Sequence, residues 1–302
     1  MYFMLQKYDD RNASIKVWVK DKLVDRKNAM ISVFDSSVQG GDAVWEGIRV
    51  YPQGVFCLDR HLDRLEDSAR AMAFSDVPTR DFIKNAIFAT LRSNEMKDQV
   101  HIRLTLTRGE KITSGMDPRL NTSGSTLIVL AEWKPPVYDN DKGIKIITST
   151  IRRNSPMNLD SKIHHNNLIN NILAKIQANH ANVDDALMLD NYGFIAEMNG
   201  TNIFLVKDNI LITPLPDACL HGITRALIIE IAKDLGIVVQ ERNISLTELY
   251  SSDEAFGTGS MGELTPIYEV DGRKIIDRRK NNITSTLSAS FQKLAIDYCT
   301  QF

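Results

Sequence analysis

The stretch LDSKIHHNNLINNILAK, residues 159–175, places a single lysine just before a pair of histidines. Lys162 follows a polar, proline-containing segment and precedes a predicted helix, a place from which a side chain can reach into a cleft. An unprotonated amine there could attack a carbonyl group, whereas an ordinary loop lysine is only a solvated charge, and the residues alone leave both open. His164 and His165 are neighbours, so their side chains diverge, and no histidine or acidic residue follows at metal-ligand spacing. A metal site is therefore not predicted.

The segment LHGITRALIIEIAKDLG, residues 220–236, could bind an anion at the start of a helix. Gly222, Ile223 and Thr224 stand where the first amides of the helix lack partners and the helix dipole is positive. The Thr224 hydroxyl could add a contact to a phosphate group, or Thr224 could serve only as the N-cap of the helix.

A second candidate is the glycine-rich turn FGTGSMGELTP, residues 256–266. Its glycines, including Gly262, surround Ser260 and Met261 and allow a ligand to approach the backbone closely. Neither this turn nor the helix start matches the dinucleotide-binding or P-loop patterns, so a nucleotide site is not indicated.

Glu197 lies in GFIAEMNGTNIFLV, residues 193–206, among apolar residues of two predicted strands. A carboxylate in such surroundings needs a cation or hydrogen-bond donors to remain ionised. The alternative is that Glu197 simply faces solvent from the surface of its strand.

The elements that must position these residues fall into two groups. In the first half, residues 101–110 and 125–133 have strand patterns, and residues 58–93 have a helical pattern. The segment KPPVYDNDKG that follows cannot continue either pattern, which predicts a linker. The second half contains a strand at 144–151, a helix at about 167–181, four short strands, and a helix at 224–236 that ends on a glycine. The predicted division is an α+β domain over 1–133, a linker over 134–142, and a second α+β domain over 143–302.

The composition limits the function classes. The chain has 302 residues, a formal net charge of −2, 43% hydrophobic and 25% charged residues, which is typical of a folded two-domain protein. Its basic residues are dispersed, so a nucleic-acid partner is not expected. No run of about 18 apolar residues or signal peptide is recognisable, so we expect no membrane association and a cytoplasmic location. Cys57, Cys219 and Cys299 are odd in number and widely spaced, which favours neither disulfides nor a metal site.

Seven segments, in this order, resemble the class IV aminotransferases, the pyridoxal-phosphate family that includes branched-chain and D-amino acid aminotransferases. The resemblance extends from about residue 30 to about residue 273, most of the chain. The segments are GGDAVWEGIRVY (40–51), DRHLDRLEDSA (59–69), HIRLTLTRG (101–109), SKIHHNNLINNILAK (161–175), GFIAEMNGTNIFLVK (193–207), TPLPDACLHGITR (213–225) and GTGSMGELTPI (257–267).

The resemblance implies a fold type IV enzyme of two α+β domains, like D-amino acid aminotransferase, with pyridoxal 5'-phosphate at the domain interface and a homodimer as the assembly. It implies that Lys162 forms the Schiff base with the cofactor aldehyde, with His164 as the alternative in an ungapped comparison, and that Glu197 pairs with the pyridine nitrogen. The implied phosphate contacts are Arg64 of the H-x-x-R-L pattern, the amides of Ile223 and Thr224, and the hydroxyl of Ser260, where the family more often has threonine.

The chemistry of the cofactor agrees with these roles. Pyridoxal phosphate withdraws electrons best when its ring nitrogen is protonated, and a buried carboxylate such as Glu197 keeps it so. Lys162 must lose its proton to attack the aldehyde and can afterwards carry a proton to and from the substrate.

The resemblance also implies a substrate site. Its residues would be Trp45, Gly47 and Arg103 with the backbone near Met261 and Gly262, and the two apolar side chains would contact an aliphatic substrate. The predicted function is amino-group transfer between a branched-chain L-amino acid and 2-oxoglutarate, a step of amino-acid biosynthesis. The alternatives are a D-amino acid aminotransferase, for which Arg119 could supply the basic residue, an aminodeoxychorismate lyase, and a catalytically silent relative that binds phosphate ligands.

Overall fold

The computed structural model describes residues 8–276 and 282–302 and divides the chain into two compact units. Unit 1 comprises Pro136–Lys162 and Leu168–Asp297. Unit 2 comprises the described residues up to Pro135, together with Ile163–Asn167 and Tyr298–Phe302. Each unit contains helices and a sheet, as the prediction of an α+β fold in two parts requires. The chain passes from unit 2 to unit 1 inside the predicted linker, and it returns briefly to unit 2 directly after Lys162.

Unit 2 is built on an antiparallel sheet. Its described strands are β1 (Lys16–Val19), β2 (Lys22–Asp25), β3 (Ala43–Tyr51), β4 (Gly54–Phe56), β5 (Val100–Thr107), β6 (Thr126–Trp133) and β16 (Cys299–Thr300). They lie in the order β16-β4-β3-β5-β6-β1-β2. The helices are α1 (Ser36–Gly40), α2 (Leu58–Ala71) and α3 (Arg80–Ser93), with short 3-10 helices η1 (Asp10–Ser14), η2 (Arg26–Asn28) and η3 (Pro118–Leu120).

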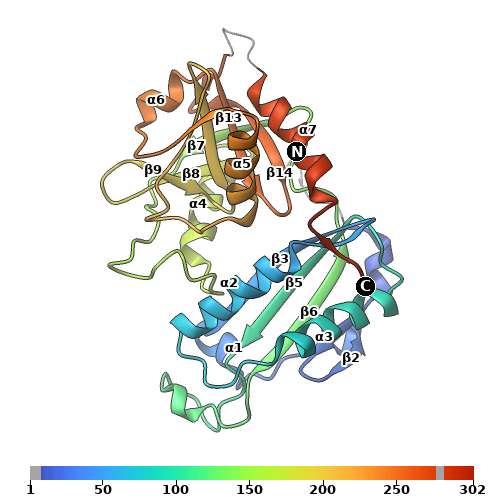
Figure 1. Cartoon of the computed structure of the whole chain (residues 1–302). Helices are drawn as coiled ribbons and strands as arrows, with labels where there is room; N and C mark the ends of the chain where they lie inside the picture. Colours follow the sequence, from blue (N-terminus) through green and yellow to red (C-terminus); the bar gives the residue numbers. More distant parts are fainter. Residues whose placement is uncertain (1–7, 277–281) are drawn as a thin grey trace. The chain divides into compact units, whose positions relative to one another are not determined.

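The core of unit 2 forms between one face of this sheet and the helices α2 and α3 (Figure 1). The strand pattern predicted for 101–110 is confirmed in β5, where alternate residues from Val100 to Leu106 are buried. The helical pattern predicted over 58–93 is divided in two, because residues 72–79 contain turns and end at Thr79, whose side chain caps α3.

Unit 1 contains a mixed sheet. Its described strands are β7 (Ile144–Thr148), β8 (Asp185–Leu189), β9 (Ile195–Met198), β10 (Asn202–Lys207), β11 (Ile210–Thr213), β12 (Val238–Glu241), β13 (Glu254–Gly259), β14 (Glu263–Val270) and β15 (Arg273–Lys274). The order is β12-β11-β10-β13-β14-β7-β8-β9, with β15 paired to β14. The pairs β7 with β8, β7 with β14, and β11 with β12 are parallel, and the other pairs are antiparallel. The helices are α4 (Ile169–His180), α5 (Ile223–Asp234), α6 (Leu246–Tyr250) and α7 (Ile283–Ala295).

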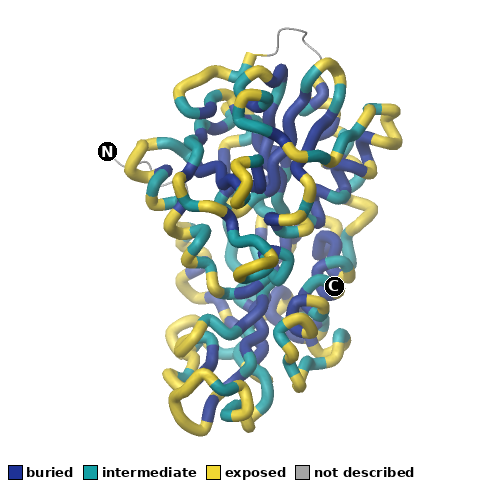
Figure 2. The backbone as a smooth tube through the Cα atoms, turned by 90° about the vertical axis from the view of Figure 1, so that its left-hand side faces the viewer, coloured by how far each residue is buried: buried dark blue, intermediate teal, exposed yellow. Residues whose placement is uncertain are grey.

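The helices of unit 1 follow from their sequences. α5 buries Leu227, Ile228 and Ile231 against the sheet, and the predicted terminating glycine is confirmed, because Gly236 has a φ of 72° just after the C-cap. α4 packs against β8 through Ala174 and Ala178. Figure 2 shows buried and exposed segments alternating along the chain, and strands β9 and β10 are among the buried segments. Among the described residues, no helix is long and apolar enough to cross a membrane.

Candidate functional site

Strands β3 and β5 of unit 2 bring together three residues predicted to contact the substrate. Gly47 and Arg103 are directly paired, and Trp45 lies two residues from Gly47, so the three share one face of the sheet. The Arg103 guanidinium lies 3.4 Å from the centroid of the Trp45 ring and donates to Asn166 Oδ1 at 2.6 Å. Burial lowers the pKa of Arg103 to about 10, so it remains a cation at neutral pH. A Cβ at position 47 would lie 3.2 Å from His101 Nε2 and 3.3 Å from the Trp45 ring, so glycine lets both rings approach.

Arg64, a predicted phosphate contact, is held by a buried carboxylate. His61 and Arg64 lie three residues apart on α2 and therefore on one face of the helix. Arg64 donates through Nε and Nη2 to the two oxygens of Glu46 at 2.8 and 2.6 Å, and His61 Nδ1 lies 2.7 Å from Glu46 Oε2. Burial alone would raise the pKa of Glu46, but the charge of Arg64 and the hydrogen bonds from Arg64 and His164 hold it well below its ordinary value. Glu46 was not predicted as a site residue, although it lies inside the WEGIR motif.

His164 lies in unit 2, where both its backbone and its ring contact residues of β3. The Trp45 amide donates to the His164 carbonyl at 2.9 Å and the Asn166 amide donates to the Ala43 carbonyl at 2.8 Å, so this segment extends the edge of β3. Its imidazole Nδ1 lies 3.1 Å from Glu46 Oε1, and its ring centroid is 4.1 Å from that of Trp45. Burial lowers the pKa of His164 to about 4, so the ring is neutral above that pH.

Glu197 is 4% exposed, so the alternative of a surface position on its strand is wrong. Its Oε1 accepts from Arg153 Nε at 2.5 Å, and Arg153 is buried as well. Its Oε2 accepts from Asn202 Nδ2 and from the Leu220 amide, both at 3.3 Å. Arg153 is positioned because its amide donates to the Leu189 carbonyl at the end of β8, which pairs with β9. The carboxylate therefore has the cation and the donors that its burial requires.

Lys162 lies near the loop that runs from Asp217 to the start of α5. Its amine donates to the Asp217 carbonyl at 3.4 Å and forms an ion pair with Asp160 at 2.9 Å, and its side chain is 35% exposed. Three residues further along this loop, the Leu220 amide donates a hydrogen bond to the Glu197 carboxylate. The Lys162 side chain is therefore partly exposed, while the loop that its amine contacts also contacts the buried carboxylate.

The start of α5 has the features of an anion site. Its N-cap is Gly222, so the alternative that Thr224 is the N-cap is wrong. Ile223 and Thr224 occupy the first turn, where amides lack helical partners, and the buried Thr224 hydroxyl has no hydrogen-bond partner among the residues that the structure describes. A Cβ at position 222 would lie 2.0 Å from Asn202 Oδ1, so only glycine permits this close approach of the Asn202 side chain.

The turn that carries Ser260, Met261 and Gly262 joins β13 to β14. The Gly262 amide donates to the Gly259 carbonyl at 3.2 Å, which closes the turn. Glu263 follows with a φ of 53°, in the left-handed region that favours glycine. These three predicted residues therefore lie together on a tight hairpin loop of unit 1.

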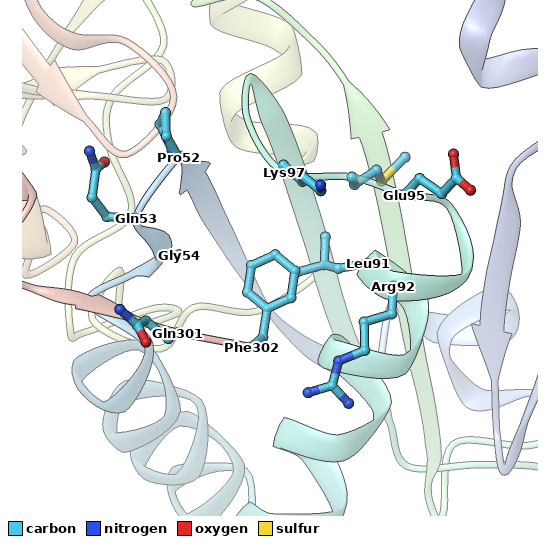
Figure 3. A pocket seen from close by; sticks show the side chains of 10 residues that line it. Pro52, Gln53, Gly54, Leu91, Arg92, Glu95, Lys97, Gln301 and Phe302 are labelled. Carbon is cyan, nitrogen blue, oxygen red and sulfur yellow. The ribbon is translucent and has the colours of Figure 1, made fainter.

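Arg119 and a surface groove of unit 2 lie apart from the candidate site residues described above. Arg119 is 89% exposed and forms an ion pair with Asp117, two residues before it. A surface groove of about 840 Å³ in unit 2 is lined by residues 52–54, 91–92, 95–97 and 301–302, several of them charged (Figure 3). None of the predicted site residues lines this groove.

Sequence reasoning missed the partners of the charged site residues. Arg153, Asn202 and Glu46 were not predicted, although the need of Glu197 for a cation was. Arg153 is separated from Glu197 by 44 positions, so no local spacing connects them. The two adjacent arginines of the segment IRRNSP, next to a predicted strand, are the sequence feature that could have indicated a cationic partner for Glu197.

Comparison with known proteins identifies similar chains. The sequence model of the family described as Amino-transferase class IV matches residues 43–270. The chain is 58% identical over 283 residues to branched-chain-amino-acid aminotransferase-like protein 2 of Arabidopsis thaliana, covering 94% of this chain and 51% of that protein. It therefore spans about half the length of this relative.

Solved structures resemble most of the chain. A branched-chain aminotransferase from Thermoproteus uzoniensis with norvaline has a TM-score of 0.86 and 31% identity, covering 94% of this chain and 96% of that one. A branched-chain amino acid aminotransferase from the organism abbreviated T.th., complexed with N-(5'-phosphopyridoxyl)-L-glutamate, has a TM-score of 0.86 and 30% identity, covering 94% and 95%.

Proposed function

The chain belongs to the class IV aminotransferase family, and on that basis we propose that it is a pyridoxal-phosphate-dependent transaminase acting through Lys162. The proposed reaction moves an amino group between a branched-chain L-amino acid and 2-oxoglutarate. The similar proteins named above are branched-chain aminotransferases or are named for their likeness to them, which supports this substrate class. The cytoplasmic location stays a prediction.

The observation that carries the proposal is the course of the loop from Asp217 to Thr224. The loop contacts the Lys162 amine at one end, the Glu197 carboxylate through Leu220, and then begins α5. Asp217 and Leu220 are three residues apart, a span of at most about 11 Å. An amine, a buried carboxylate and an anion-binding helix start are thus gathered along one short segment, as the cofactor requires.

The residues at the start of α5 fit the phosphate of the cofactor. The buried Thr224 hydroxyl, which has no partner in residues 8–276 and 282–302, and the first-turn amides of Ile223 and Thr224 are donors, which is what a phosphate dianion needs. Ser260 and Arg64 are the further proposed phosphate contacts, and Glu197 is the proposed partner of the pyridine nitrogen. When bound, pyridoxal phosphate supplies the electron-withdrawing ring that stabilises negative charge on the substrate carbon.

The protein residues then have separate tasks. Arg153 holds Glu197 as an anion through a charge-assisted hydrogen bond, so that Glu197 can keep a proton on a neighbouring base. Lys162 is the proposed carrier of the proton at the substrate carbon, and Asp160 is the carboxylate that lies beside its amine. His164 is not the proposed nucleophile, because its ring contacts Glu46 and lies tilted against the Trp45 ring, and an imidazole cannot form an imine.

The proposed substrate contacts in unit 2 are Trp45, Gly47 and Arg103. The Trp45 ring offers apolar surface, and Arg103 offers a buried cation that can bind a carboxylate. Met261 and Gly262 are the proposed contacts in unit 1. Arg119 is paired and largely exposed, which does not favour the D-amino acid alternative.

A homodimer is the proposed assembly. On α4 the residues Ile169, Ile172, Leu173 and Ile176 are exposed by 42 to 63% and repeat at helical spacing, so they form one apolar stripe. The nearby Lys175 is turned away, because its amine donates to the Asp184 carbonyl. A second copy could therefore bring the same stripe against this one without opposing like charges.

The decisive experiment uses purified full-length chain with added pyridoxal phosphate. We expect an absorption band near about 410 to 430 nm, typical of this cofactor bound to a lysine, and borohydride should fix the cofactor to Lys162. Activity with L-leucine, L-valine, D-alanine and aminodeoxychorismate should be greatest with the branched-chain L-amino acids. Lys162→Ala should abolish both signals, and His164→Asn should retain the band.

Each alternative has its own outcome. A preference for D-alanine or aminodeoxychorismate would replace the proposed substrate and keep the cofactor. A colourless protein in which Lys162→Ala changes nothing would support the catalytically silent relative.

A further inference from the structure

The segment Val137–Asn140 was predicted to be part of a linker, yet it is bound to unit 1 at the turn of candidate site residues. The Val137 amide donates to the Met261 carbonyl at 3.4 Å, and Asn140 Nδ2 donates to the Gly262 carbonyl at 2.9 Å. Two successive peptide carbonyls of the turn are therefore hydrogen bonded to the same segment.

Both polar atoms of the Asn140 side-chain amide are hydrogen bonded. Its Oδ1 accepts from the buried Thr265 Oγ1 at 2.7 Å, while its Nδ2 donates to Gly262. The threonine hydroxyl has one proton and also lies 3.2 Å from the Gly262 carbonyl, so the shorter contact to Asn140 is preferred. Reversing the amide would place its oxygen against the Gly262 carbonyl, two acceptors together, so this orientation is imposed by the site.

The segment that carries Asn140 is itself anchored. The buried Tyr138 donates from its hydroxyl to Asp185 Oδ2 at 2.7 Å, and Asp139 Oδ1 accepts from the amides of residues 141 and 142 in a tight turn. Asn140 therefore contacts the hairpin loop from a rigid base.

The loop that it contacts has reason to need support. Glu263 adopts a φ of 53°, which costs a non-glycine residue roughly as much as a hydrogen bond contributes. A Cβ at Gly262 would lie 3.3 Å from Thr265 Oγ1 and 3.8 Å from the Tyr138 ring, so the loop is packed closely against the segment.

We propose that Asn140 is a positioning residue that sets the position of the Gly262 peptide, next to Met261, and thereby the contacts of these two residues with the amino-acid substrate. The ligand consequence rests on the proposed function. Asn140 acts through the loop and does not itself contact substrate, and Thr265 sets the orientation of its amide.

The first test does not depend on ligand or activity. Hydrogen exchange measured by mass spectrometry on the full-length chain should show faster exchange of the peptide containing residues 259–265 in Asn140→Ala, by about three- to ten-fold, the factor for loss of one neutral hydrogen bond. Thr265→Val should have the same effect and Thr265→Ser should not, because serine keeps the hydroxyl. Asp141→Ala, an exposed neighbour, is the matched control and should leave the exchange unchanged.

The second test separates positioning from a general structural role. In Asn140→Ala the KM for L-leucine should rise about three- to ten-fold, while kcat and the affinity for pyridoxal phosphate change by less than about two-fold. Unchanged exchange and unchanged KM in both Asn140→Ala and Thr265→Val would overturn the proposal. If wild-type protein takes up no pyridoxal phosphate, the proposed function fails, and the exchange result alone decides whether Asn140 holds the loop.

Discussion

The pair formed by Arg153 and Glu197 allows a quantitative test of how the carboxylate is held. Both side chains are buried, and the contact between Arg153 Nε and Glu197 Oε1 is 2.5 Å. In Arg153→Met, the carboxylate would lose this cation and keep the neutral donors Asn202 Nδ2 and the Leu220 amide, both at 3.3 Å. Removing one partner of a buried ion pair typically costs about 3–5 kcal/mol of unfolding free energy, because the other charge is left uncompensated.

The double variant measures the interaction free energy between Arg153 and Glu197 more directly than either single variant. Replacing both partners, in Arg153→Met with Glu197→Gln, removes the buried charges together and should regain at least about 2 kcal/mol relative to the sum of the single effects. Urea unfolding followed by far-UV circular dichroism reports on both units, whereas the tryptophans, Trp18, Trp45 and Trp133, report on unit 2 alone. A selective shift of the dichroism transition would locate the loss in unit 1.

The reasoning has a clear point of failure. An Arg153→Met variant within about 1 kcal/mol of the wild type, or single effects that add to within about 0.5 kcal/mol in the double variant, would show that Glu197 does not depend on this cation. The role proposed for Arg153 would then have to be abandoned.

Three further predictions concern other parts of the chain. Gly222→Ala should greatly weaken pyridoxal phosphate binding, measured by absorption titration, because its Cβ would displace Asn202, whereas Gly200→Ala meets no atom within 4 Å and should bind normally. The free energy of unfolding should fall as the pH drops from about 6.5 to about 4, because the unfolded chain protonates His164 and His101 while burial lowers their folded pKa values to about 4 and about 3. Urea midpoints measured across this range should therefore decline, and they should decline less steeply in His164→Asn. A flat profile would contradict the burial of these rings. Ile172→Glu on the apolar stripe should convert the proposed dimer to monomers in sedimentation velocity; a wild type that is monomeric at micromolar concentration would refute the proposed use of the stripe.

The elements could be predicted where periodicity is strong and local. The strand at 101–110 and the helix at 224–236 were predicted within a few residues of β5 and α5, because alternating or helical burial and a terminal glycine are recorded in consecutive positions. The break between α2 and α3 was missed, although Asp76 and Pro78 in residues 72–79 are signals that a helix ends there.

The candidate site could be predicted only in part. Glu197 was singled out because an acid among apolar residues is unusual in itself, but its partner Arg153 could not be found, because which cation reaches it depends on the pairing of β8 with β9. The same holds for Asn140, which lies in a segment whose prolines and aspartates predict a linker. Its contact with Gly262 joins residues 122 positions apart. Local composition indicated that this segment is irregular, and only the fold shows what it binds.

His164, the first residue of the histidine pair, contacts the carboxylate that holds the predicted site residue Arg64. His164 lies on the edge of β3 with its ring on Glu46, and Glu46 in turn fixes the guanidinium of Arg64 through two hydrogen bonds. Buried ion pairs are weak evidence for stability, since desolvating both charges offsets most of their attraction. Two such pairs, Arg64 with Glu46 and Arg153 with Glu197, each involve one residue predicted to contact the cofactor. Their common effect is to hold a charged side chain in one orientation before a ligand arrives, which reduces the ordering that binding would otherwise require.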